Sequence, residues 1–172
     1  NGAQHALILD LYAEKTPHNQ ETGGSYGDTK EFDDTPWLYC MLNNFGGRLG
    51  LHGHLDNMAR EIPKAFNSAK HIAGIGITPE ASVNNPVLYD FLFETIWQAD
   101  AAQNLRQIDL DTWLDSYAQR RYGAASESAN AAWDILKETV YKSSLNNLGQ
   151  GAPESVVNAR PALSIQAAST WG

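Results

Sequence analysis

One stretch decides the fold: His71-Ile72-Ala73-Gly74-Ile75-Gly76-Ile77-Thr78-Pro79-Glu80, a short apolar run that ends in a carboxylate. Glycine and proline are poor helix formers and the run is too short for a core helix, so it predicts a buried strand. Glu80 then lies where a strand ends. In α/β barrels the carboxyl ends of the strands carry the chemistry, so Glu80 is a candidate catalytic group if the fold is of that kind. The alternative is a solvated glutamate in a loop.

Two more apolar runs precede this stretch. Residues 6–11 form a continuous apolar run broken only by Asp10, which predicts a buried strand of a parallel sheet with Glu14 just beyond its end. Residues 36–42 are apolar and aromatic-rich, and they predict a second strand that ends at the pair Asn43-Asn44. All three predicted strands are therefore followed by polar side chains.

Helical patterns follow the second and third strands. A helix is expected between about residues 55 and 66, kinked or restarted at Pro63, because proline interrupts the helical hydrogen-bond ladder. Three further helices are predicted from N-cap residues, which are Asn85, Asp109 and Ser126. Their apolar stripes are Leu88, Phe91, Leu92 and Ile96; Leu110, Trp113, Leu114 and Tyr117; and Trp133, Leu136 and Val140.

The order of these elements is typical of the closing part of an α/β barrel or of an open parallel sheet, followed by a separate helical layer. Three strands cannot close a barrel, which needs eight. Either upstream units are missing from the chain or the sheet is open. The chain enters its first apolar run almost at once and stops at Trp171-Gly172, and we therefore expect a fragment of something longer.

Composition excludes several classes of partner. The net charge is -8 and the basic residues cluster only at Arg120-Arg121, whereas phosphate binding needs several cations together, so no nucleic-acid surface is predicted. No apolar run approaches the roughly 18 residues of a membrane span, and the first residues lack a signal-peptide pattern. The single Cys40 rules out an intramolecular disulfide but does not fix the compartment.

The strand ends suggest a reaction. In a parallel sheet every strand ends on the same side, so Glu14 and Glu80 are expected to face one crevice. Two carboxylates with flat aromatic neighbours, here Trp37 and Tyr39, are what glycoside hydrolysis needs. Each position also has a structural interpretation, because both rings can be core residues and the Asn43-Asn44 pair can satisfy the backbone of a turn.

A metal site is the weaker alternative. His52 and His54 have a spacing that suits a strand or loop, and Asp56 follows them, but a metal site needs three or four convergent ligands and no matching set is present elsewhere. The Gly46-Gly47 pair lacks the following Lys-Ser/Thr of a phosphate-binding loop. The sequence thus predicts no metal and no cofactor.

Three segments in this order and spacing resemble α-N-acetylglucosaminidases of glycoside hydrolase family 89. They are Pro36-Trp37-Leu38-Tyr39-Cys40-Met41-Leu42-Asn43-Asn44-Phe45-Gly46-Gly47, then Gly74-Ile75-Gly76-Ile77-Thr78-Pro79-Glu80, and Arg120-Arg121-Tyr122-Gly123, with Leu9-Asp10-Leu11-Tyr12-Ala13-Glu14 ahead of them. The agreement runs from about Leu7 to the segment around Pro161, which is most of the chain.

The resemblance implies the last strands of a (β/α)8 barrel over residues 1–100, followed by part of an all-helical domain over residues 101–172. It also implies a retaining enzyme that requires no metal and whose nucleophile is Glu80. Tyr39 falls where the family has an aromatic, usually Trp, that lines the sugar pocket. Asn43 falls where relatives can carry His, whereas Asn44 fits the pattern. The expected substrate-binding residues are Tyr39, Asn43, Asn44, Glu14 and Trp37.

One part of the family's machinery is missing from the sequence. The family's acid/base is a Glu that follows an Asn on an earlier strand, and the chain contains no such pair. We therefore expect the rest of the catalytic domain, supplied by an upstream segment or another chain, to be a necessary partner, and the isolated chain to be inactive. By the same resemblance, a secreted or lysosomal-type compartment is expected.

The expected substrate is a glycan with a terminal α-linked N-acetylglucosamine, and heparan-type and mucin-type ends both stay open. Its 2-acetamido group lies cis to the leaving oxygen and cannot attack C1 from the opposite face, so the enzyme must supply a carboxylate. Two other hypotheses are kept. One is a non-catalytic carbohydrate-binding or interaction module, and the other is a metal-dependent barrel hydrolase that uses His52 and His54.

Overall fold

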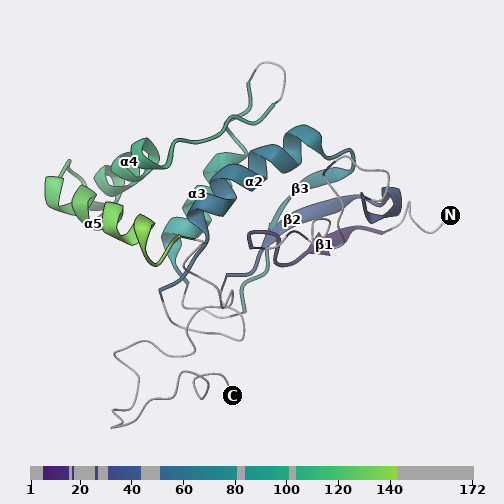
Figure 1. Cartoon of the computed structure of the whole chain (residues 1–172), viewed down its shortest axis with the longest axis horizontal. Coiled ribbons are helices and arrows are strands. Elements are labelled where there is room, and N and C mark those ends of the chain that lie inside the picture. Colours follow the sequence, from purple (N-terminus) through teal and green to yellow (C-terminus); the bar gives the residue numbers. More distant parts are fainter. Residues whose placement is uncertain are drawn as a thin grey trace, which may run out of the picture.

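The computed structural model describes residues 6–15, 17, 26, 31–43, 51–80, 84–100 and 104–142. Three parallel strands form one sheet in the order β1-β2-β3 (Figure 1). Their bounds are β1 Ile8–Asp10, β2 Trp37–Met41 and β3 Ile72–Ile77. All three strands predicted from the apolar runs are confirmed, and they are neighbours, so their carboxyl ends lie along one edge of the sheet. The predicted burial holds for most of β2 but is wrong for β3, in which no residue is buried among the described residues.

The two faces of the sheet differ. Successive side chains of a strand point to opposite faces, and Trp37, Tyr39 and Met41 join the buried core cluster. Leu9 pairs with Leu38 and therefore belongs to the other face, and its side chain is 49% exposed. One face of the sheet thus carries the core of the chain, and the other face has apolar side chains that the described residues leave open.

Glycine fits the backbone of β3 for a steric reason. A Cβ added to Gly76 would lie 2.7 Å from Sγ of Cys40 on the neighbouring strand, and no ordinary Cβ contact is that short. The glycine of the Gly-x-Gly segment therefore leaves room for the buried Cys40 side chain between the strands.

Helix α2 (Leu55–Ser68) runs alongside the sheet and covers the core face (Figure 1). The predicted helix is confirmed, but the prediction that it restarts at Pro63 is wrong, because α2 continues through this residue as one helix. Pro63 is buried with the apolar side of the helix, which packs on the core. We infer that this burial offsets the hydrogen bond that proline cannot donate, a cost of about 3 kcal/mol in a helix interior.

Three more helices follow the sheet: α3 (Pro86–Thr95), α4 (Leu110–Tyr122) and α5 (Glu127–Glu138). A short helical segment, η2 (Glu31–Asp34), lies before β2. The pair α4 and α5 lies at the end of the molecule away from β1 (Figure 1). None of the helices in the described part of the chain has the length and apolar composition to cross a bilayer.

The predicted helix starts are confirmed with one difference. The side chain of Asp109 accepts a hydrogen bond from the Thr112 amide, and that of Ser126 accepts one from the Ala129 amide. Asn85 occupies the N-cap position of α3 but makes no such bond. Its Nδ2 instead donates to the carbonyl of His52, which ties the start of α3 to the segment ahead of α2.

Candidate active site

The carboxyl ends of the three strands are tied together by Thr78, which directly follows β3. Its backbone amide donates to the carbonyl of Met41, the last residue of β2, at 3.0 Å. Its hydroxyl lies 3.2 Å from the same carbonyl and 3.3 Å from the carbonyl of Leu11, just after β1. A single hydroxyl therefore reaches the ends of both other strands and holds the chain two residues before Glu80.

Glu80 lies three residues beyond β3, at the common carboxyl edge of the sheet, and its side chain is exposed. It projects from a segment that is anchored through Thr78 rather than from an isolated loop. A bound substrate can therefore approach the carboxylate at an edge where polar groups from two other strands also end.

Asn43 follows β2 and adopts a left-handed backbone conformation, with φ of 57°. Asn is one of the few non-glycine residues that adopts this conformation readily. Asn43 is 1% exposed, and its amide donates to Oε1 of Glu14 at 2.8 Å. Asn44, the second predicted substrate-binding asparagine, lies outside the described residues.

Glu14, predicted to be a substrate-binding carboxylate, is 1% exposed among the described residues. Its Oε1 accepts hydrogen bonds from the backbone amides of Leu42 at 3.1 Å and Asn43 at 2.8 Å. Burial raises the pKa of Glu14 to about 8, although these two amides oppose the shift, and the nearby charge of Asp10 adds to it. The carboxyl is therefore neutral near pH 7 and fixes the backbone after β2.

Trp37 and Tyr39 also lie away from an open pocket. Both side chains are fully buried, and Trp37 stands at the amino end of β2, where its Nε1 donates to Oε1 of Glu31 at 2.6 Å. A ring without exposed surface offers no face on which a sugar can stack. Both rings therefore lie in the core of the described residues, and their assignment to the sugar pocket stays a prediction.

The two histidines of the metal hypothesis form a buried pair. The ring centroids of His52 and His54 are 4.9 Å apart and the rings meet edge to face. Burial, with His52 and Lys15 adding to the effect, lowers the pKa of His54 to about 3, so this imidazole is neutral. Within the described ranges, no group of three or more His, Cys, Asp or Glu side chains could hold a metal ion.

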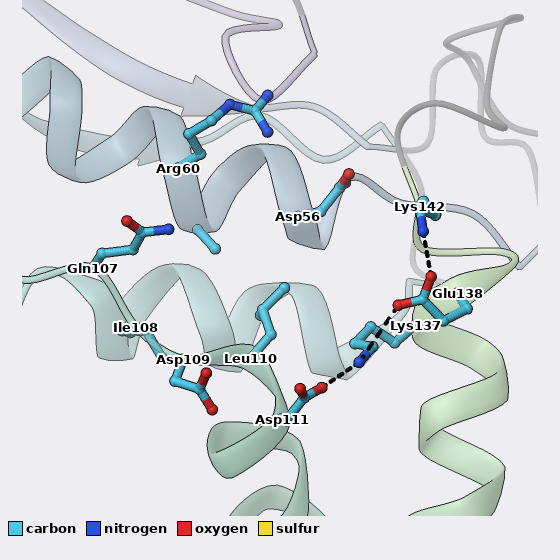
Figure 2. A pocket seen from close by; sticks show the side chains of 11 residues that line it. Asp56, Arg60, Gln107, Ile108, Asp109, Leu110, Asp111, Lys137, Glu138 and Lys142 are labelled. Atoms are coloured by element: carbon cyan, nitrogen blue, oxygen red, sulfur yellow. Dashed lines mark hydrogen bonds and ion pairs between the residues drawn. The ribbon is translucent and has the colours of Figure 1, made fainter.

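A pocket of about 550 Å³ lies away from the strand ends, between α2, the start of α4 and the end of α5 (Figure 2). Its basic side chains are engaged by carboxylates. Lys137 pairs with Asp111 and Glu138, Lys142 pairs with Glu138, and Arg60 pairs with Glu61. The pocket contains none of the residues at the carboxyl edge of the sheet, so it is separate from the candidate active site.

Comparison with known proteins decides the family. A family model for the α-N-acetylglucosaminidase (NAGLU) TIM-barrel domain matches residues 2–99, which is more than half of the chain. The chain belongs to the α-N-acetylglucosaminidases of glycoside hydrolase family 89. The model for the C-terminal domain of the same family matches residues 113–171.

Individual family 89 proteins agree with this assignment. Human α-N-acetylglucosaminidase is 35% identical over 167 residues, which are 96% of this chain and 20% of the human protein. A family 89 glycoside hydrolase from Clostridium perfringens in complex with 2-acetamido-1,2-dideoxynojirimycin is 42% identical, with a TM-score of 0.76 over 97% of this chain and 17% of that chain. A doubly Glu→Gln substituted form of that hydrolase, in complex with its substrate GlcNAc-α-1,4-galactose, is 38% identical, with a TM-score of 0.73 over the same shares.

The chain spans about a fifth of the length of the human relative. Within this family 89 segment, sequence reasoning missed two residues that organise the strand ends, Thr78 and Asn57. Thr78 stands directly between a strand and Pro79, a position that could have been noticed. Asn57 is a polar residue among the buried positions of α2, and a polar residue there signals a buried hydrogen bond.

Proposed function

We propose that the protein that carries this chain removes terminal α-linked N-acetylglucosamine from glycans by a retaining double displacement, with Glu80 as the nucleophile. The observation that carries the proposal is the position of Glu80. It is an exposed carboxylate at the common carboxyl edge of three parallel strands, in a chain that belongs to family 89. Active sites of α/β barrels lie at this edge.

The chemistry of the substrate requires such a group. The 2-acetamido group of an α-linked N-acetylglucosaminide is cis to the leaving oxygen and cannot reach the opposite face of C1. A protein carboxylate must attack there, with a second carboxyl group about 5 to 5.5 Å away to protonate the leaving oxygen. The relative captured with GlcNAc-α-1,4-galactose carries two Glu→Gln substitutions, which supports a mechanism with two carboxyl groups.

The chain supplies one of these two groups. We assign the acid/base to the part of the catalytic domain that this chain does not contain, because its Asn-Glu pair is absent from the sequence. Residues 1–100 then form the last strands of a (β/α)8 barrel and residues 101–172 part of the helical domain, in line with family models that match residues 2–99 and 113–171. The isolated chain is expected to be inactive.

Turnover of an aryl α-N-acetylglucosaminide by the full-length protein tests the proposal. Glu80→Gln keeps the shape of the side chain but removes the nucleophile, so we expect kcat to fall at least about 1,000-fold. Glu127→Gln changes an exposed glutamate in the first turn of α5 and is the matched control, with expected activity near that of the wild type. Unchanged turnover in Glu80→Gln contradicts the proposal, and wild-type activity that a chelator abolishes favours the metal-dependent alternative.

A further inference from the structure

The buried carboxyl of Glu14 joins two strand ends that are far apart in the sequence. Its Oε1 accepts the amides of Leu42 and Asn43, which directly follow β2. The turn that carries Glu14 is itself held, because the Ala13 amide donates to the carbonyl of Cys40 at 3.1 Å. The turn after β1 is thus attached to the end of β2 by three hydrogen bonds.

Helix α2 holds this turn from the other side. Nδ2 of Asn57 donates to the main-chain carbonyl of Glu14 at 2.6 Å and lies 3.3 Å from that of Lys15. Glu14 is therefore fixed by its own backbone to α2, and its side chain fixes the backbone of Asn43. This chain of contacts runs from a helix on the outside of the sheet to the residue at which the backbone leaves β2 in a left-handed turn.

We propose that Glu14 is a positioning residue that holds the Asn43 backbone in its left-handed conformation and so places the Asn43 side chain for sugar binding, without touching the sugar itself. The inference deepens the proposed glycosidase function and rests on it for its kinetic consequences. It assigns Glu14 a role other than the direct substrate contact expected from the sequence.

The two hydrogen bonds from the Leu42 and Asn43 amides need an acceptor at only one of the two carboxyl oxygens of Glu14. Both amides point to Oε1 of Glu14, whereas Oε2 is buried and has no hydrogen-bond partner among the described residues. Burial holds the pKa of Glu14 near 8, so the group is a neutral carboxylic acid under acidic and neutral assay conditions. Glutamine is also neutral and can present its carbonyl oxygen to the same two amides.

Glu31 offers a matched control at the opposite end of the sheet. It is fully buried, and it accepts hydrogen bonds from Nε1 of Trp37 at 2.6 Å and from the backbone amides of Lys70 at 3.2 Å and His71 at 3.3 Å. It is thus a buried glutamate that joins two segments, as Glu14 does, but at the amino end of β2, far along the strand from Glu80. We therefore expect its loss to affect stability and to leave the carboxyl edge of the sheet unchanged.

The test compares Glu14→Gln, Glu14→Ala and Glu31→Ala in the full-length protein, with kinetics on an aryl α-N-acetylglucosaminide, melting temperatures and crystal structures. We expect Glu14→Ala to lower kcat/KM roughly 10- to 100-fold, mainly through KM, because small displacements of binding groups are costly. Glu14→Gln should stay within about 3-fold of the wild type, since the acceptor is kept. Glu31→Ala should lower the melting temperature and leave KM unchanged.

Two results overturn the inference. Glu14→Gln as impaired as Glu14→Ala at an unchanged melting temperature would mean that the carboxyl group itself acts on the sugar. A crystal structure of Glu14→Ala in which Asn43 keeps its positive φ would show that Glu14 does not position this residue. The crystallographic comparison decides the inference even if the wild type does not cleave the glycoside, a result that would instead reject the proposed function.

Discussion

At the scale of single residues, Glu14 shows what a sequence pattern cannot resolve. Its place after an apolar run predicted a polar group near the strand ends, and the structure agrees with that location. Glu14 accepts hydrogen bonds from Asn57 and Asn43, which lie 43 and 29 positions further along the chain. Contacts of that separation have no local signature, so the sequence did not predict the buried hydrogen bonds of this carboxyl.

The raised pKa of Glu14 predicts a pH effect on stability. Between its ordinary value of 4.5 and its folded value of about 8, the unfolded state releases the proton while the folded state keeps it. The contribution of Glu14 is thus fully present below pH 4.5 and is lost as the pH rises toward 8. The melting temperature of the wild type should therefore fall more than that of Glu14→Gln between about pH 5 and about pH 8. Equal losses in the two proteins would show that the folded pKa of Glu14 is not raised.

At the scale of elements, the apolar runs predicted each strand, and the polar caps predicted the starts of the later helices. These features are local, since a strand needs only a buried run and a helix start only a side-chain acceptor for an amide. Pro63 is a position at which a prediction from local sequence rules differs from the structure. The local rule predicts a kink or restart, but α2 does not restart there, because its buried side, including Pro63, packs on the core.

The close packing of β2 against β3 predicts that a methyl group added at Gly76 destabilises the protein. Gly76→Ala places a Cβ 2.7 Å from Sγ of Cys40, and overpacking of this kind typically costs about 1 to 3 kcal/mol in the free energy of unfolding. The double variant Gly76→Ala with Cys40→Ala removes the sulfur and should recover much of this loss. Denaturant unfolding of the wild type, both single variants and the double variant measures the coupling. Additive effects would mean that the two side chains do not meet.

At the scale of the whole molecule, the chain is a family 89 segment that spans about a fifth of its human relative. The open face of the sheet, with Leu9 half exposed, is consistent with further parts of the protein that cover this face. A family model for a TIM-barrel domain matches residues 2–99, which favours a barrel over an open sheet. In the sequence, the barrel was implied by the resemblance of the motifs around Asn43 and Glu80 to family 89, and not by the apolar pattern of the strands.

The central claim, that Glu80 is the nucleophile of a retaining enzyme, is tested most directly by azide rescue of Glu80→Gly in the full-length protein. Azide can occupy the space that the carboxylate leaves and attack C1 of an activated aryl α-N-acetylglucosaminide from the opposite face. We predict that turnover returns only with azide and that the glycosyl azide product has the β configuration. A glycosyl azide of α configuration, or turnover that does not depend on azide, would contradict the assignment.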